Sequence, residues 1–172
     1  MTSWHRGCPV PVSSLRLLRM TYVGFDGQPH EGEMIVHRGW ARPVLGVFRM
    51  LYDARFPIRR MRLVEAYGSD DDRVGLADDT SGFNCRYVGG TTTWSEHAYG
   101  RAVDVNPLEN PYVVNGRVSN RAYRPFVDRS HWRPGMVHAR DKVVRAFAAI
   151  GWRWGGYWHS AVDYMHFSAT GR

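Results

Sequence analysis

Two short segments of the sequence carry residue types that can bind a metal ion. The first, residues 94–107, reads WSEHAYGRAVDVNP and contains His97 and Asp104. Gly100 lies between them and permits a tight turn that a bulkier residue would resist. Residues 101–105 then alternate in the manner of a short strand, so Asp104 points to one side and the flanking valines to the other. A turn followed by a strand can therefore bring an imidazole and a carboxylate to one point.

The second segment, residues 163–167, reads DYMHF and contains Asp163 and His166. Zinc accepts imidazole and carboxylate ligands, and a catalytic zinc needs three protein ligands while its fourth position holds water. His97, Asp104 and His166 are the three candidates. Either segment alone is a weak signal, because a single histidine near an aspartate is more often a surface pair or a satisfied buried histidine. The two segments together favour a zinc site.

The combined motif resembles that of a family of zinc peptidases. This family includes D-alanyl-D-alanine carboxypeptidases, L-alanyl-D-glutamate endopeptidases, the VanY-type enzymes and several phage endolysins. The motif reads Ser95-x-His97-x-x-Gly100-x-Ala102-x-Asp104, followed later by Asp163-x-x-His166. The resemblance covers residues 63–167 and extends only loosely to the first half of the chain. It implies a zinc-dependent peptidase whose substrate is the stem peptide of bacterial peptidoglycan.

The resemblance also implies a role for each principal residue. His97, Asp104 and His166 would be the zinc ligands. Asp163 would be the catalytic base, which accepts a proton from the attacking water and later passes one to the leaving amine. Ser95 is a candidate for orienting this cluster and for contacting the substrate; the alternative is an ordinary turn hydroxyl.

One departure from the family concerns an arginine. Many members carry it in a Ser-Gly-Tyr-Arg segment after an earlier strand, where it steadies the oxyanion or carboxylate of the substrate. The corresponding segment here reads Glu65-Ala66-Tyr67-Gly68 and lacks the arginine. We expect Arg86 to replace it as a catalytic and substrate-binding residue, since guanidinium suits forked contacts with carboxylates. A solvated arginine is the alternative.

The base also bears on which bond is cleaved. The carboxypeptidase branch usually shows glutamate where this chain has Asp163, and aspartate resembles the endopeptidase branch. We therefore expect hydrolysis of the L-Ala–D-Glu bond, with a D-alanyl-D-alanine carboxypeptidase as the alternative. A non-catalytic zinc-containing domain that grips peptidoglycan is a further alternative. Asp163 argues against it, because a structural zinc site needs no base.

The composition favours a folded, basic protein with an acidic partner. The chain of 172 residues, of which 44% are hydrophobic, is long enough for one domain with its own core. The formal net charge is +7, which suits either nucleic acid or the anionic bacterial wall. The basic residues are scattered and accompany no nucleic-acid-recognition motif. We therefore expect a substrate in the bacterial cell wall and no nucleic-acid partner. We assume that the protein is a monomer.

The sequence leaves open the export route and the state of the two cysteines. No apolar run approaches the roughly 20 residues that span a bilayer, and residues 1–16 lack the apolar core of a signal peptide. Another export route, a missing leader or release by lysis would each fit an extracytoplasmic or cell-wall location. Cys8 and Cys85 could form a disulfide in an oxidising compartment. Two buried reduced thiols are an equal alternative, although we provisionally expect the pairing.

The periodicities predict a single α+β domain, residues 1–172, in which an antiparallel sheet carries the zinc site and helices flank it. Residues 15–25 and 32–37 should form a hairpin, and apolar residues at helical spacing predict a helix over residues 41–56. Residues 61–67 resemble a strand, and residues 68–80 resemble a solvated acidic loop.

The second half is less regular. Residues 111–134 should be a long irregular region that forms a wall or lid of the substrate groove. Residues 136–150 return to helical spacing and end before Gly151. The aromatic residues of 152–158 could line a groove, although packing alone would account for half of them.

Overall fold

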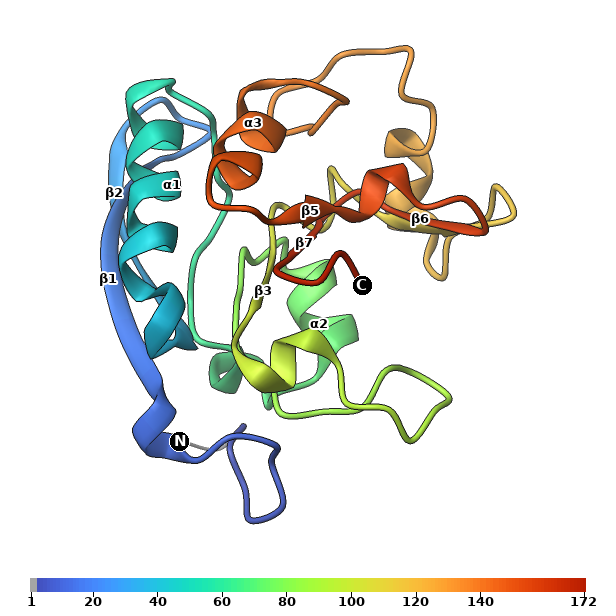
Figure 1. Ribbon diagram of the computed structural model, residues 1–172. Helices are drawn as coiled ribbons and strands as arrows, with labels where there is room; N and C mark the ends of the chain where they lie inside the picture. The colour runs from blue at the N-terminus through green and yellow to red at the C-terminus, as the bar shows by residue number, and fades with distance from the viewer. Residues whose placement is uncertain (1–2) are drawn as a thin grey trace.

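A long hairpin with a helix packed against it forms one side of the molecule (Figure 1). The computed structural model describes residues 3–172. Strands β1 (Leu15–Val23) and β2 (Pro29–His37) pair antiparallel along their whole length, as the alternating sequence predicts. Helix α1 (Ala41–Asp53) packs against β1. Its buried stripe has the spacing of one helical face and consists of Val44, Val47, Phe48 and Leu51.

The other helices and strands are short. The α-helices are α2 (Asp71–Leu76) and α3 (Lys142–Ala149). The strands are β3 (Ala102–Asp104), β4 (Tyr112–Val114), β5 (Arg153–Trp154), β6 (Ala161–Asp163) and β7 (His166–Ser168). The 3-10 turns are η1 (Val12–Ser14), η2 (Arg38–Trp40), η3 (Val64–Tyr67), η4 (Glu96–Tyr99), η5 (Arg121–Phe126) and η6 (Gly155–Tyr157).

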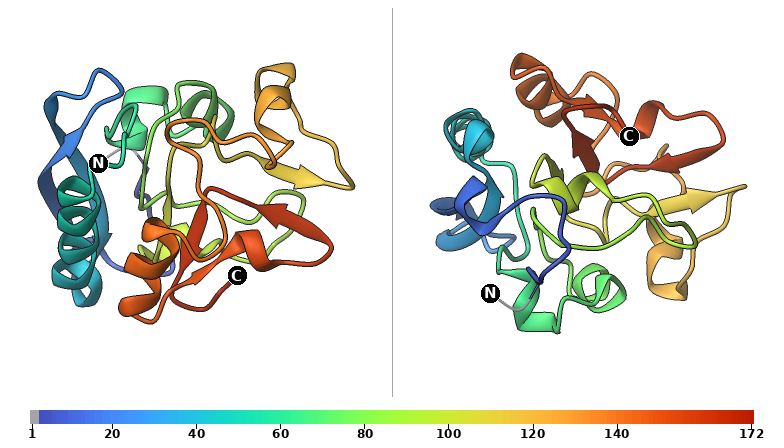
Figure 2. Two further views of the ribbon diagram at one scale, coloured as in Figure 1. Left: turned by 90° about the horizontal axis from the view of Figure 1, so that it is seen from above. Right: turned by 60° about the horizontal axis from the view of Figure 1, so that its bottom comes forward.

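The described residues form three antiparallel sheets rather than the one sheet expected. Strands β1 and β2 form the first sheet, β3, β7 and β5 the second in that order, and β4 with β6 the third. Helices α1 and α3 pack together between the hairpin and the central sheet, and β4–β6 lies on the far side of that sheet (Figures 1 and 2). The α+β class is as predicted, and the candidate site belongs to the central sheet.

The main hydrophobic core lies between the central sheet and helices α1 and α3. Phe147 of α3 packs edge-on against Phe48 of α1, with 6.4 Å between ring centroids, and stacks on Phe167 of β7 at 4.1 Å. Val103 of β3 is also fully buried in this cluster. Burial of large side chains is the main favourable term in folding. The strands that carry Asp104 and His166 are therefore anchored by the main hydrophobic core.

Two predictions for residues 61–80 were wrong. The expected strand at 61–67 is a 3-10 turn, η3, and the expected solvated loop at 68–80 contains α2. Asp70 caps that helix, because its side chain accepts a hydrogen bond from the amide of Arg73 at 3.1 Å. Asp78 and Asp79, which follow it, are buried rather than solvated.

The second half also differs in part from the prediction. Residues 111–134 are not wholly irregular, since they contain β4 and η5. Helix α3 begins at Lys142 rather than near residue 136, because Asp141 caps it with a 2.8 Å bond from the Val144 amide. Trp152 and Trp154 are buried in the main core, which agrees with the expectation that packing accounts for half of the aromatic residues of 152–158.

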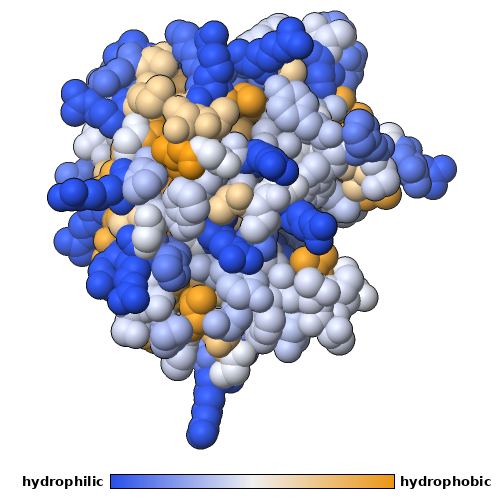
Figure 3. Space-filling view, in the orientation of Figure 1, coloured by the Kyte–Doolittle hydropathy of each residue, from blue (hydrophilic) through white to orange (hydrophobic). Residues whose placement is uncertain are grey.

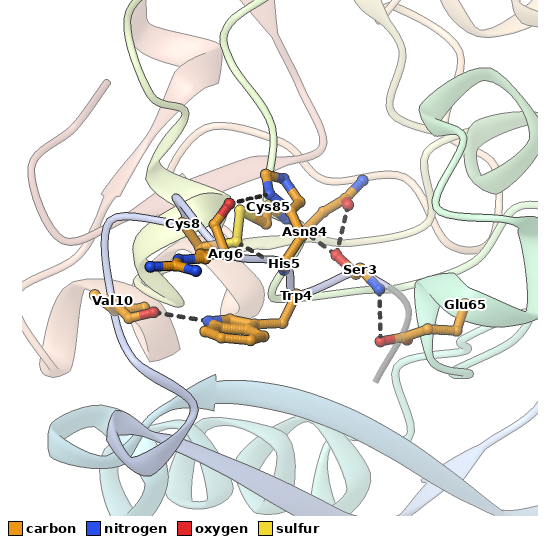
Figure 4. The surroundings of a disulfide bond; sticks show 9 residues. All are labelled: Ser3, Trp4, His5, Arg6, Cys8, Val10, Glu65, Asn84 and Cys85. Carbon is orange, nitrogen blue, oxygen red and sulfur yellow. Dashed lines mark hydrogen bonds between the residues drawn. A yellow bond between two sulfur atoms is a disulfide. The ribbon is translucent and has the colours of Figure 1, made fainter.

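Hydrophilic residues dominate the face seen in Figure 3, and hydrophobic residues occupy only small areas of it. Within residues 3–172, no helix has the length and apolar character needed to cross a membrane. Cys8 and Cys85 form a disulfide, which confirms the expected pairing (Figure 4).

Candidate metal centre

The pairing of β3 with β7 brings Asp104 and His166 together. These strands are antiparallel, and Asp104 lies directly opposite His166 in the register. Directly opposite residues of an antiparallel pair project to the same face with their Cβ atoms close together. The three residue pairs of β3 and β7 therefore make neighbours of two residues that are far apart in the sequence. A shift of the strand pairing by one residue would turn the Asp104 side chain to the opposite face of the sheet.

A tight turn before β3 delivers His97. Ser95 precedes η4, and its hydroxyl accepts a hydrogen bond from the His97 amide at 3.3 Å. Gly100 ends the turn in the left-handed conformation, with φ of 65°. A Cβ atom there would lie 2.6 Å from the amide nitrogen of His37. Glycine thus serves both the backbone conformation and the close approach to β2, as the sequence led us to expect for the turn.

The three side chains converge on one point. Nε2 of His97 lies 3.1 Å from Oδ2 of Asp104 and 3.3 Å from Nδ1 of His166. Nδ1 of His166 lies 3.0 Å from Oδ1 of Asp104. One donor atom from each residue lies within 4.8 Å of the other two. The two imidazoles are buried and Asp104 is half-buried.

The outer nitrogen of each imidazole is held by a backbone carbonyl. Nδ1 of His97 lies 2.6 Å from the carbonyl oxygen of Gly82, and Nε2 of His166 lies 2.9 Å from that of Arg172. A carbonyl oxygen can only accept, so the outer nitrogen carries the proton in each ring. In a neutral ring the inner nitrogen then carries a free lone pair, which is directed at the point where the three side chains meet. Metal-binding histidines adopt this arrangement.

The charges at this point are complementary. Burial alone would raise the pKa of Asp104, but His97 and His166 outweigh it and hold that pKa below its usual range. Burial alone would lower the pKa of His166, but the hydrogen bond and charge of Asp104 outweigh it and raise the pKa to about 9. Asp104 is therefore an ionised carboxylate, and without a metal the protonated His166 balances its charge. A bound cation would take the place of the proton on Nδ1 of His166.

Asp163 lies beside this group without joining it. It ends β6 and, with Asp104 and His97, lines a cavity of about 200 Å³. Burial, followed by the negative charge of Asp104, raises the pKa of Asp163 to about 7. Its Oδ1 atom is buried and has no hydrogen-bond partner among residues 3–172. A carboxyl group with these properties can exchange a proton near neutral pH.

The cavity also contains Arg86 but not Ser95. Arg86 lines it and forms an ion pair with Asp71. Ser95 is buried and does not line the cavity. Its hydroxyl is directed at the turn of His97, and its expected substrate contact stays a prediction. Its other expected role, orienting the cluster, agrees with that hydrogen bond.

Several residues that shape the site were not singled out from the sequence. Gly82 supplies the carbonyl that holds His97, and a Cβ atom there would lie 2.5 Å from the carbonyl oxygen of Ile35. A Cβ atom on Gly155 would lie 2.7 Å from the carbonyl oxygen of Asp163. Tyr112, Ser119 and Tyr123 line the cavity, in agreement with the expectation that residues 111–134 form a wall. The length of that region was the sequence signal for a wall, and it singled out none of these three residues.

The donor set fits zinc. Two inner imidazole nitrogens and one carboxylate oxygen are ligands that catalytic zinc sites use, and the carbonyls of Gly82 and Arg172 supply the outer shell. Within residues 3–172, the other group able to hold an ion contains Cys8 and Cys85, whose sulfurs are joined in the disulfide. His97, Asp104 and His166 would therefore hold the metal.

A comparison with protein families agrees with this chemistry. The model of a family described as D-alanyl-D-alanine carboxypeptidase matches residues 89–169, just under half of the chain. The matched segment includes all three candidate ligands and Asp163, whereas Arg86 lies before it. No curated protein and no solved structure matches. The resemblance inferred from the two motifs is thereby confirmed over this segment, and it indicates a peptidase.

Proposed function

We propose that this chain, whose residues 89–169 match the D-alanyl-D-alanine carboxypeptidase family, is a zinc-dependent peptidase of the bacterial cell wall. Its substrate is the stem peptide of peptidoglycan, and the bond it hydrolyses is the one between L-Ala and D-Glu. The observation that carries the proposal is the cavity in which His97, Asp104 and Asp163 lie together.

Each residue of the cavity has a part in this reaction. Zinc held by His97, Asp104 and His166 would activate a water molecule and polarise the carbonyl of the scissile bond. Asp163 accepts a proton on its carboxylate and returns it to the leaving amine. This role requires a carboxyl group that is not a ligand, and Asp163 stands outside the three-residue group. Burial prepares it for the role by raising its pKa to about 7.

Arg86 supplies the positive charge that the substrate needs. Its guanidinium group lines the same cavity and can make forked hydrogen bonds to a carboxylate of the stem peptide. The ion pair with Asp71 limits its freedom, so less conformational entropy is lost on binding. Arg86 thus takes the place of the arginine that the resemblance led us to expect at residues 65–68.

Two further observations support the proposed place of action. The disulfide between Cys8 and Cys85 is typical of proteins that work in an oxidising compartment outside the cytoplasm. The net charge of +7 favours association with an anionic polymer. We therefore assign the protein to the cell wall or the extracytoplasmic space.

The family description itself favours a second candidate, removal of the terminal D-Ala. One digestion separates the two. The zinc-loaded protein is incubated with purified peptidoglycan, and the newly exposed amino groups are labelled and identified, with Asp163→Asn as the control. New D-Glu N-termini support the endopeptidase, and released D-Ala without them supports the carboxypeptidase. If the wild-type protein exposes no new amino groups, both peptidase assignments are wrong.

A further inference from the structure

A segment at the start of the described chain reaches the wall of the catalytic cavity. Residues 3–8, which we call the strap, lie against residues 84 and 85, and Figure 4 shows both segments with the contacts between them. Arg86 follows directly and lines the cavity, as does Asn84. The strap lies outside the matched family segment, residues 89–169. Neither the two motifs nor the family match gives it a function.

Ser3 makes two hydrogen bonds to this wall. Its hydroxyl donates to Oδ1 of Asn84 at 2.8 Å and accepts from the amide of Cys85 at 3.0 Å. The residue is only 3% exposed. Without this hydroxyl, the Cys85 amide and the Asn84 carbonyl oxygen would each lose a partner in a buried setting. Buried polar groups that lose their partner are costly, so the wall would rearrange.

The disulfide ties the other end of the strap to the same wall. Cys8 and Cys85 are 77 residues apart in the sequence. Trp4 and Cys8 pack against a buried cluster that includes Phe83 and Cys85. Residues 83–85 are therefore held by apolar packing, by the covalent link and by the hydroxyl of Ser3.

Asn84 passes this restraint on to the charged groups of the cavity. Its Nδ2 donates to Oδ1 of Asp71 at 2.8 Å and to the carbonyl oxygen of Ser69 at 3.3 Å. Asp71 in turn forms the ion pair with Arg86. An unbroken line of polar contacts thus runs from Ser3 through Asn84 and Asp71 to Arg86.

We propose that the strap positions Arg86 for substrate binding, with Ser3, Asn84 and the disulfide as the positioning groups. This proposal rests on the peptidase function and adds to it the part of the chain that determines substrate affinity. Asp104 and His166 are held by the pairing of β3 with β7. His97 is held by the η4 turn, by the carbonyl of Gly82 and by the backbone amide of Asn84, which donates to the His97 carbonyl at 3.2 Å. None of these bonds uses the side chain of Ser3 or Asn84, so loosening the strap should weaken substrate binding and leave the zinc ligands in place.

The test compares Ser3→Ala with Ser3→Thr, which keeps the hydroxyl, and with Ser13→Ala, an exposed serine, as the control. The substrate is a soluble stem peptide that contains both the L-Ala–D-Glu link and a terminal D-Ala–D-Ala. We expect Ser3→Ala to raise KM roughly three- to tenfold, the loss associated with one or two hydrogen bonds. The kcat and zinc content should stay at wild-type values, and Ser3→Thr should restore KM.

A double-mutant cycle distinguishes positioning from general loosening. If the strap acts through Arg86, Ser3→Ala should add no further rise in KM to an Arg86→Ala protein. The pair Cys8→Ser and Cys85→Ser, which cannot form the disulfide, is measured in the same way and serves if Ser3→Ala does not fold. It should also raise KM without loss of zinc.

The outcomes separate the two proposals. An active wild-type protein whose KM is unchanged by Ser3→Ala overturns the strap proposal alone. A KM rise that is equally large in the Arg86→Ala background overturns it as well. A wild-type protein that holds zinc and cleaves neither bond overturns the proposed function and the strap proposal with it.

Discussion

Two aspartates of one cavity have opposite electrostatic settings, and this contrast assigns their parts. Asp104 faces two imidazoles, which hold its pKa below the usual range. Asp163 is enclosed and lies near the negative charge of Asp104, so that burial and this charge raise its pKa to about 7. Groups whose pKa values are driven apart in this way commonly divide into a charge-bearing and a proton-transferring member. Asp104 is then suited to bind a metal cation, and Asp163 is suited to transfer a proton.

The first prediction concerns Asp163. Asparagine has the same shape but cannot accept the proton, so Asp163→Asn should retain zinc and lose about 10²–10⁴-fold in turnover. Metal analysis and hydrolysis of the stem peptide are measured on the same preparation. Near-normal turnover would exclude Asp163 as the base, and loss of zinc would make it a ligand instead.

The second prediction concerns the two histidines. Each contributes one inner nitrogen to a three-residue group, so His97→Ala or His166→Ala should sharply reduce the zinc content of the purified protein. His131→Ala is the control, because that side chain is 75% exposed and pairs with Asp128 away from the centre. Full zinc occupancy in both His97→Ala and His166→Ala would show that these histidines are not the zinc ligands.

At the scale of the elements, the site depends on register and turns more than on long periodic segments. The hairpin and α1 could be predicted because each repeats its pattern over many residues. Strands β4 to β7 have two or three residues each, too few for any periodicity to be visible. The candidate residues were predictable because histidine, aspartate and glycine stand at characteristic spacings. The carbonyl of Gly82 was not, because no side chain marks it.

The third prediction tests one of these turns. Gly100 and Gly116 both have positive φ, 65° and 73°, but only Gly100 has backbone atoms of β2 where a Cβ atom would lie. Gly116→Ala should cost only the left-handed conformation, about 1–2 kcal/mol. Gly100→Ala must in addition displace the turn from His37, whose amide donates to the Gly100 carbonyl at 2.7 Å.

Gly100→Ala should therefore destabilise the protein more than Gly116→Ala does and should weaken zinc binding through His97. Thermal unfolding and zinc titration of both variants provide the measurement. Equal effects of the two substitutions would show that the close approach of Gly100 to β2 does not matter.

At the scale of the whole molecule, buried acids link segments that are distant in the sequence. Asp79 accepts hydrogen bonds from the amide of Arg62 at 2.9 Å and from the hydroxyl of Tyr67 at 3.2 Å. Glu109 lies beside Asp78, and Arg59 is 3.5 Å from both carboxylates. The acidic character of residues 68–80 suggested solvent exposure, but sequence alone does not reveal that these carboxylates are enclosed by other segments.

The last prediction follows from these enclosed acids. Burial raises the pKa of Asp79 from 3.8 to about 7, and burial together with Asp78 raises that of Glu109 from 4.5 to about 8. The folded protein therefore retains protons that the unfolded chain releases near pH 4. Wherever the folded state binds more protons, stability falls as pH rises, so this contribution is lost between about pH 4 and pH 8. For Asp79 the loss is at most about 4 kcal/mol.

Asp79→Asn isolates the effect, because the amide keeps an oxygen for both hydrogen bonds and does not titrate. Its melting temperature relative to the wild-type protein should rise between pH 5 and pH 8.5, since only the wild-type side chain acquires a buried charge. Asp53→Asn is the control, because that carboxylate is exposed on α1 and contacts water in both the folded and the unfolded protein. A difference between Asp79→Asn and wild type that does not change with pH would show that Asp79 is already ionised in the folded protein at pH 5.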